Sequence, residues 1–102
     1  MTEEITMQLI VNSGDARSKA MEAIASAKAG RIEEAREKLQ KAQDFLTKAH
    51  SFQTDLMQEE ADGKVNNVSI LMAHAQDHLM NAITVLDIAH EFVDLYERIS
   101  KL

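Results

Sequence analysis

Residues 68–86, "VSILMAHAQDHLMNAITVL", carry the most informative pattern in this sequence. Its apolar residues recur at alternating steps of four and three, which is the spacing of one face of an α-helix. With histidines counted as neutral, Asp77 is the only formally charged residue between Val65 and Leu86. A helix with one face in water would carry Lys and Glu on that face, as amphipathic helices do. The pattern therefore predicts a helix that is buried on two sides.

Two sets of residues define these two sides. The first set can fill the core of a helical bundle and consists of Val68, Met72, Ala75, Leu79, Ala82, Leu86, Ala89, Val93 and Tyr96. The second set lies roughly opposite, at about 100° per residue, and consists of Ile70, His74, Asp77, Asn81, Ile88 and Leu95. A chain of 102 residues forms one modest core, which covers one of the two faces. The other face needs a further copy or a partner, and identical chains usually form a closed symmetric oligomer.

Two further helices are expected before this one. Gly30 separates two helical patterns, and the segment "EEADGKVNN" (59–67) separates the second from the third. Asn66 and Asn67 are candidate N-caps for the third helix. The sequence therefore predicts a single all-α domain over residues 1–102, an up-down-up bundle with helices at about 3–28, 32–59 and 66–100.

The second helix carries a regular apolar stripe, which consists of Ile32, Ala35, Leu39, Ala42, Leu46, Ala49, Phe52 and Leu56. The stripe of the first helix is less regular and consists of Ile5, Leu9, Ala16, Ala20, Ile24 and Ala27. The segment "NSGDARS" (12–18) interrupts it. Gly14 costs about 1 kcal/mol relative to alanine inside a helix. We expect a kink or a close approach of two helices there, with a binding role as the alternative.

Composition excludes several classes of protein. The chain has no proline or cysteine and only three glycines, so it lacks the turn residues of a sheet and any Cys-ligated zinc or disulfide. Its net charge is −6, with basic residues scattered among more acidic ones, which does not suit nucleic-acid binding. The N-terminus is acidic where a secretory signal is basic. No apolar run reaches the roughly 20 residues of a membrane span. We expect a cytoplasmic protein.

Asp77 lies on the second face of the third helix. An isolated buried carboxylate costs several kcal/mol unless it is protonated, paired or bound to a cation. If copies of this helix meet on a symmetry axis, each Asp77 meets its own copies. A divalent cation with oxygen ligands, Mg²⁺ or Ca²⁺, would resolve the repulsion. The alternative is a partly exposed Asp77 held by neighbouring groups.

His74 and His78 are four residues apart and share a helix face. Three roles are open to such a pair. Zinc ligation is disfavoured because no third ligand lies at a suitable spacing, with His90 sixteen residues from His74. The pair can simply form hydrogen bonds within an interface. It can also carry a phosphoryl group, because neutral imidazole is a nucleophile. The chain lacks a P-loop, so a phosphoprotein would have to be the donor.

Several separated motifs resemble the lactose/cellobiose-type enzyme IIA of the bacterial sugar phosphotransferase system. The active-site-like segment is "HAQDHLM" (74–80). The other matching segments are "LIVNSGDARSKAMEAI" (9–24), "AKAGRIEEA" (27–35), "KAHSFQTDL" (48–56) and "LYERI" (95–99). The resemblance covers nearly the whole chain. The alanine in "HAQDH" is more similar to the cellobiose, chitobiose or lichenan branch than to the lactose branch.

The resemblance implies a homotrimer, in which three subunits form a nine-helix bundle. It implies that His74 is the phosphohistidine and that one Asp77 from each subunit holds a single Mg²⁺. The implied donor is HPr, and the implied acceptor is a cysteine of the cognate IIB, which acts with the membrane component IIC in uptake of a β-disaccharide.

Four further side chains have assigned roles. His78 is expected to support His74, and Gln76 is a candidate for partner contact. His50 is interpreted as structural and His90 as a surface or interface residue. The competing hypothesis is a helical adaptor without phosphotransfer activity, whose third helix docks on a different protein.

Overall fold

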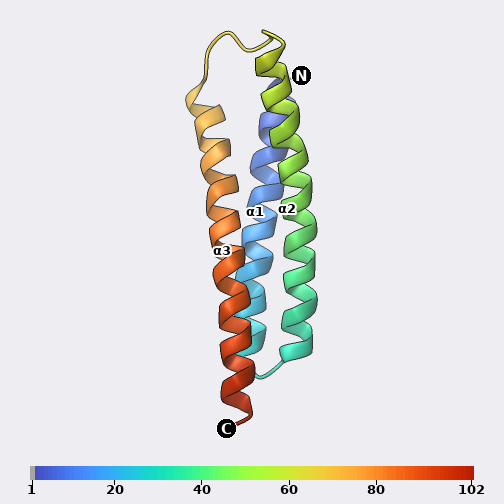
Figure 1. The fold of residues 1–102 in the computed structure, drawn as a ribbon, viewed down its shortest axis with the longest axis vertical. Helices are drawn as coiled ribbons and strands as arrows, with labels where there is room; N and C mark the ends of the chain where they lie inside the picture. Colours follow the sequence, from blue (N-terminus) through green and yellow to red (C-terminus); the bar gives the residue numbers. More distant parts are fainter. Residues whose placement is uncertain (1) are drawn as a thin grey trace.

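A computed structural model describes residues 2–102, which form three long helices: α1 (Thr2–Lys28), α2 (Ile32–Ala61) and α3 (Ile70–Ser100). Figure 1 shows that α1 and α3 run in one direction and α2 in the other, so the bundle is up-down-up as predicted. The molecule is slender, with extents of 57 × 18 × 16 Å. No helix within residues 2–102 is long and apolar enough to cross a membrane.

Two glycines end α1 and α2 in the same way. Gly30 and Gly63 have φ values of +86° and +74°, in the left-handed region that glycine adopts without steric cost. After each glycine the chain closes a 6→1 hydrogen bond, from Arg31 N–H to the Ser26 carbonyl and from Lys64 N–H to the Glu59 carbonyl, both 2.9 Å. These bonds satisfy carbonyls that the helix end would otherwise leave free.

The third helix begins four residues later than predicted, at Ile70 and not at residue 66. Ser69 is its N-cap, because the backbone there is extended and its Oγ accepts a hydrogen bond from the Met72 N–H at 3.1 Å. Asn66 and Asn67 lie in the connecting segment instead. Val68 therefore falls outside the helix, and its side chain is exposed, so its predicted place in the core is wrong.

The core confirms the other apolar stripes. Every predicted core residue of α3 from Met72 to Val93 is buried, and α2 buries its stripe from Ala35 to Leu56 apart from the half-buried Phe52. Most of the buried apolar side chains of α1 and α2 are alanines, which lets the three helices pack closely into a thin bundle.

The segment around Gly14 differs from expectation. Helix α1 continues through it as one element. A Cβ built on Gly14 would have no heavy atom within 4 Å, so the expected close approach of another helix at this residue is wrong within the chain. Next to it, the hydroxyl of Ser13 is fully buried without a hydrogen-bond partner among the described residues.

Polar side chains fix α2 against α3 at two levels. Near one end of the bundle, Arg36 lies 2.8 Å from Asp94 and 3.1 Å from Glu97. The hydrogen bond to Asp94, with a smaller contribution from Glu97, raises the pKa of Arg36. Near the other end, Gln53 Nε2 donates to Gln76 Oε1 at 2.8 Å. The two bridges set the register of α2 and α3, and the Gln53–Gln76 bond does so at the level of the histidine segment.

Candidate functional site

The histidine pair lies in the first turns of α3. The Nε2 atoms of His74 and His78 are 2.9 Å apart, and the two rings meet edge to face, with centroids 4.4 Å apart and an interplanar angle of 83°. His74 is exposed and His78 is half-buried. The rise of about 5.4 Å per helical turn brings side chains four residues apart into contact.

The hydrogen bond restricts where the protons can be. When both imidazoles are neutral, one Nε2 carries a hydrogen and the other presents its lone pair. If His78 donates, the proton of His74 is on Nδ1 and the lone pair of its Nε2 points to His78. If His74 donates, its lone pair is on Nδ1. Only the second arrangement leaves a lone pair of His74 free to attack, at Nδ1 of an exposed side chain, which is what a nucleophilic imidazole requires.

Asp77 is exposed in the single chain, on the face of α3 that lies away from α1 and α2. None of the hydrogen bonds or ion pairs found among residues 2–102 involves its carboxylate. The rest of this face is also exposed to solvent and includes large apolar side chains such as Ile88 and Leu95. The sequence predicts that this face is buried, but no other part of residues 2–102 covers it.

Residues 2–102 of a single chain do not bring together a metal site. Over residues 2–102, no group of three or more His, Cys, Asp or Glu side chains is placed to hold an ion. The zinc alternative therefore lacks a ligand set in this part of the chain. Asp77 fits a metal only as one oxygen donor among several, which other copies would have to supply.

Gln76 does not face outward as a free contact residue. It is half-buried and accepts a hydrogen bond from Gln53 of α2 at 2.8 Å. Gln53 was not predicted as a site residue, although it lies in "KAHSFQTDL" (48–56), which resembles a family segment. The amide pair holds α3 against α2 at the level of the histidines, so it fixes the position of the helix that carries His74 and His78.

The other two histidines are apart from the pair. His50 is exposed on α2, and its backbone carbonyl accepts a hydrogen bond from Thr54 Oγ1 at 3.0 Å. His90 is exposed on α3 and lines a shallow groove with Arg36, Gln40 and other residues of α2. The structure brings neither side chain to His74.

Comparison with known proteins gives one consistent result. The profile of the PTS system, Lactose/Cellobiose specific IIA subunit, matches residues 4–97. The chain is similar to the lichenan-specific phosphotransferase enzyme IIA component of Bacillus subtilis (strain 168), with 56% identity over 99 residues, 97% of this chain and 90% of that protein.

Two solved structures share the fold. The cellobiose-specific enzyme IIA of Bacillus anthracis superposes with a TM-score of 0.93 at 52% identity, covering 99% of this chain and 93% of that one. The IIA(Chitobiose) protein of Escherichia coli, solved in complex with HPr, superposes with a TM-score of 0.85 at 35% identity, covering 98% and 97%. These similarities extend over nearly the whole chain.

Proposed function

Because this chain belongs to the lactose/cellobiose-specific IIA family of the sugar phosphotransferase system, we propose that it carries a phosphoryl group on His74. The observation that supports this assignment is the exposed imidazole of His74, hydrogen-bonded to His78 through Nε2. His50 and His90 are also exposed, but neither forms a pair of this kind with another histidine in the described chain.

The proposed reaction is a direct transfer between imidazoles. The unprotonated ring nitrogen of His74 attacks the phosphorus of the donor phosphohistidine, a new N–P bond forms, and the N–P bond of the donor breaks. The donor imidazole leaves with the electron pair of that bond. The proton on the far nitrogen of each ring can stay in place, so no separate acid or base is needed. Positioning and charge stabilisation supply most of the catalysis in such transfers.

His78 is assigned a positioning role. Its hydrogen bond to His74 limits rotation of the reactive ring and favours one tautomer, which depends on which of the two rings donates. His78 is less exposed than His74 and therefore easier to hold in one orientation. The Gln53–Gln76 bond fixes the helix that carries both rings.

The proposed donor is phospho-HPr, and the proposed acceptor is the cysteine of the cognate IIB, which works with the membrane component IIC. Support for the donor comes from the E. coli IIA(Chitobiose) neighbour, which was solved in complex with HPr. We place this exchange in the cytoplasm. The similarity to a lichenan-specific and a cellobiose-specific protein favours uptake of a β-disaccharide.

We also propose a homotrimer in which the exposed face of α3 is covered by other copies. This face presents Ile88 and Leu95 to solvent in the single chain, and buried apolar surface contributes about 25 cal/mol per Å². Three Asp77 carboxylates would then meet, and a shared Mg²⁺ would neutralise their repulsion. The ion would have a structural role, and no step of the transfer passes through it.

A chase experiment tests the carrier role. The protein is charged by phosphoenolpyruvate, enzyme I and HPr, freed of these, and mixed with the cognate IIB. The proposal expects an acid-labile phosphoryl group on this chain that is lost from it and transferred to the cysteine of IIB. His50→Ala is the matched control and should behave like the wild type. A wild-type chain that HPr cannot charge would overturn the proposal in favour of a helical adaptor.

A further inference from the structure

A hollow of about 270 Å³ lies between α1 and α2, and most of the side chains that line it are basic. Its lining consists of Lys19 of α1 and of Lys41, Asp44, Phe45 and Lys48 of α2. Residues 41, 45 and 48 are four and three apart, so one face of α2 carries two lysines with an aromatic ring between them. Because lysine has a long, flexible stem, ammonium groups from two helices can reach one ligand here.

Two of the three ammonium groups are available to an anion. Lys19 lies 3.2 Å from Glu22, whereas neither Lys41 nor Lys48 belongs to an ion pair found within residues 2–102. The one carboxylate of the lining, that of Asp44, accepts a hydrogen bond at 3.0 Å from a glutamine side chain one turn earlier on α2. Three lysines against one aspartate give the lining a net charge of +2.

The positive lining contrasts with the rest of the molecule. Residues 2–12 and 52–78 carry seven acidic side chains and one basic one, which accounts for the whole net charge of −6. The hollow lies in the remaining part of the chain, where ten acidic and ten basic side chains balance. An extended acidic surface, of a protein or a membrane, would be repelled by the molecule as a whole, whereas a small anion meets mainly the local lining. The charge distribution therefore favours a small anionic ligand.

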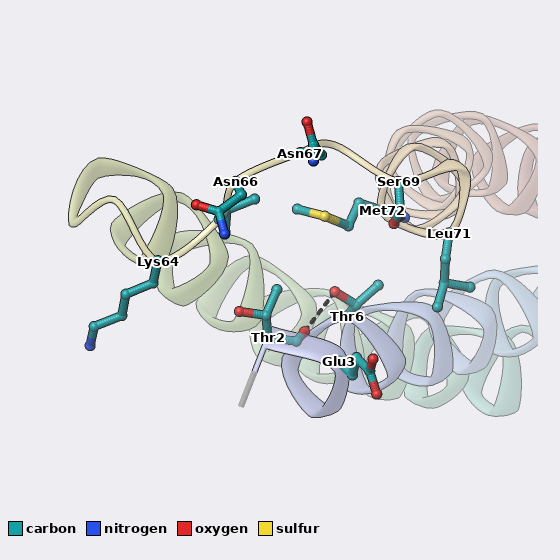
Figure 2. A pocket seen from close by; sticks show the side chains of 10 residues that line it. Thr2, Glu3, Thr6, Lys64, Asn66, Asn67, Ser69, Leu71 and Met72 are labelled. Atoms are coloured by element: carbon teal, nitrogen blue, oxygen red, sulfur yellow. Dashed lines mark hydrogen bonds between the residues drawn. The ribbon is translucent and has the colours of Figure 1, made fainter.

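The larger cavity under the connecting segment 62–69 does not have this charge. Figure 2 shows Glu3 of α1 and Lys64 of the connecting segment among the residues that line it. The other lining residues are uncharged, so one carboxylate and one ammonium group balance. Lys64 also lies 3.5 Å from Glu59. Of the two, the hollow between α1 and α2 is the one that attracts an anion.

Phe45 gives this hollow an apolar wall. Its ring is half-buried, and the Nζ atom of Lys48 lies 5.7 Å from the ring centroid, within the range of a cation–π interaction. This contact holds the ammonium group of Lys48 beside the hollow. Sites for small molecules combine apolar and aromatic walls with a few charged groups, as here. A bare inorganic ion would use only the lysines, whereas an anion with an organic body would also contact the ring.

We propose that the hollow between α1 and α2 binds a sugar phosphate, with the phosphoryl oxygens between Lys41 and Lys48 and the sugar against Phe45. Phosphate is a dianion that lysine binds as a point charge. The anion follows from the lining alone, while the sugar rests on the proposed function, because a sugar phosphotransferase system produces phosphorylated sugar. All five lining residues belong to α1 and α2, so a ligand there leaves His74 of α3 open. Binding would link the carrier to the amount of product that uptake has formed.

The test follows the amide resonances of the ¹⁵N-labelled full chain during titration at low ionic strength. The three probes are glucose 6-phosphate, inorganic phosphate and glucose. We expect glucose 6-phosphate to cause saturable shifts at residue 19 and residues 41–48, and to bind at least about threefold more tightly than inorganic phosphate. Glucose, which has no charge, should cause no shifts there.

Two charge-matched variants test the lysines. Lys41→Gln/Lys48→Gln should weaken the binding of glucose 6-phosphate about five- to tenfold, because it removes both unpaired ammonium groups of the lining. Lys28→Gln/Lys101→Gln removes two exposed lysines outside the hollow and should change the affinity less than about twofold. Equal weakening by the two variants, or no saturable shift at the hollow in the wild type, would overturn the site.

Phe45→Leu tests the apolar wall. Leucine keeps an apolar side chain at this half-buried position, so the bundle should remain folded, which circular dichroism checks. We expect glucose 6-phosphate to bind this variant only as tightly as inorganic phosphate does. Inorganic phosphate that binds the wild type as tightly as glucose 6-phosphate would overturn the sugar phosphate as the ligand. A wild type that phospho-HPr cannot charge would instead overturn the carrier role, which the titration does not test.

Discussion

The Nε2 atoms of His74 and His78 lie 2.9 Å apart, so the two imidazoles share a hydrogen bond within one face of α3. Because His74 is the more exposed of the two, it can contact a partner protein while the hydrogen bond from His78 restrains its ring. This division of roles predicts different outcomes for substitutions at the two positions.

His78→Ala is expected to slow phosphoryl transfer to His74 about tenfold without abolishing it, which corresponds to the loss of one hydrogen bond of about 1.4 kcal/mol. His78→Gln keeps an amide whose oxygen can accept a hydrogen bond from His74 Nε2–H, so it should recover part of the rate. The measurement is the single-turnover rate with phospho-HPr. If the two variants were equally slow despite intact helicity, a positioning role through the hydrogen bond would be excluded.

Gln53→Ala should reduce the free energy of unfolding by about 1 kcal/mol, because it leaves the half-buried Gln76 without its partner in α2. The Gln53→Ala/Gln76→Ala double variant should lose less than the sum of the two single variants, since the two residues act as a pair. Urea denaturation at one fixed protein concentration measures these differences. Strict additivity would mean that the bond contributes nothing to stability.

Ser13→Ala is expected to stabilise the protein by about 1 kcal/mol. The Ser13 hydroxyl is fully buried and has no hydrogen-bond partner among the described residues, so its desolvation is not compensated. Ser26→Ala is the contrasting variant, because the buried Ser26 hydroxyl accepts a hydrogen bond from Lys38 Nζ at 2.9 Å and should lose stability. Thermal or urea denaturation of both variants gives the comparison. A loss of stability in Ser13→Ala would show that the hydroxyl has a partner in solution.

Asp77→Leu should keep or strengthen the proposed trimer and remove the metal, because matched apolar residues often replace buried charges without loss. Sedimentation gives the mass of the assembly, and elemental analysis gives the ion content. The wild type should hold one Mg²⁺ per three chains. Dissociation of the variant into monomers would contradict the axial placement of Asp77 or make the ion essential to assembly.

The regular apolar patterns made most of the fold predictable. The alternating steps of three and four in α2 and α3 predicted which residues are buried, because the period of a helix determines its faces. The start of α3 was less predictable, since Asn66, Asn67 and Ser69 are all good N-caps. Only the folded chain shows that Ser69 bonds to the Met72 N–H.

The sequence predicted the members of the site better than its contacts. The spacing of His74 and His78 fixed their shared face, but the bond between Gln53 and Gln76 joins residues 23 apart in sequence and depends on the register of two helices. The close helix approach predicted at Gly14 was wrong for a similar reason. A glycine inside a helix is compatible with a close approach, but only the positions of the neighbouring helices show that none occurs there.

The most direct test of the phosphohistidine assignment is the intact mass of the chain after incubation with phosphoenolpyruvate, enzyme I and HPr, before and after mild acid. If His74 is the phosphohistidine, the wild-type chain should gain the mass of one phosphoryl group, and mild acid should remove it. The His74→Ala variant should show no gain. A His74→Ala protein that still gained an acid-labile phosphoryl group would contradict it.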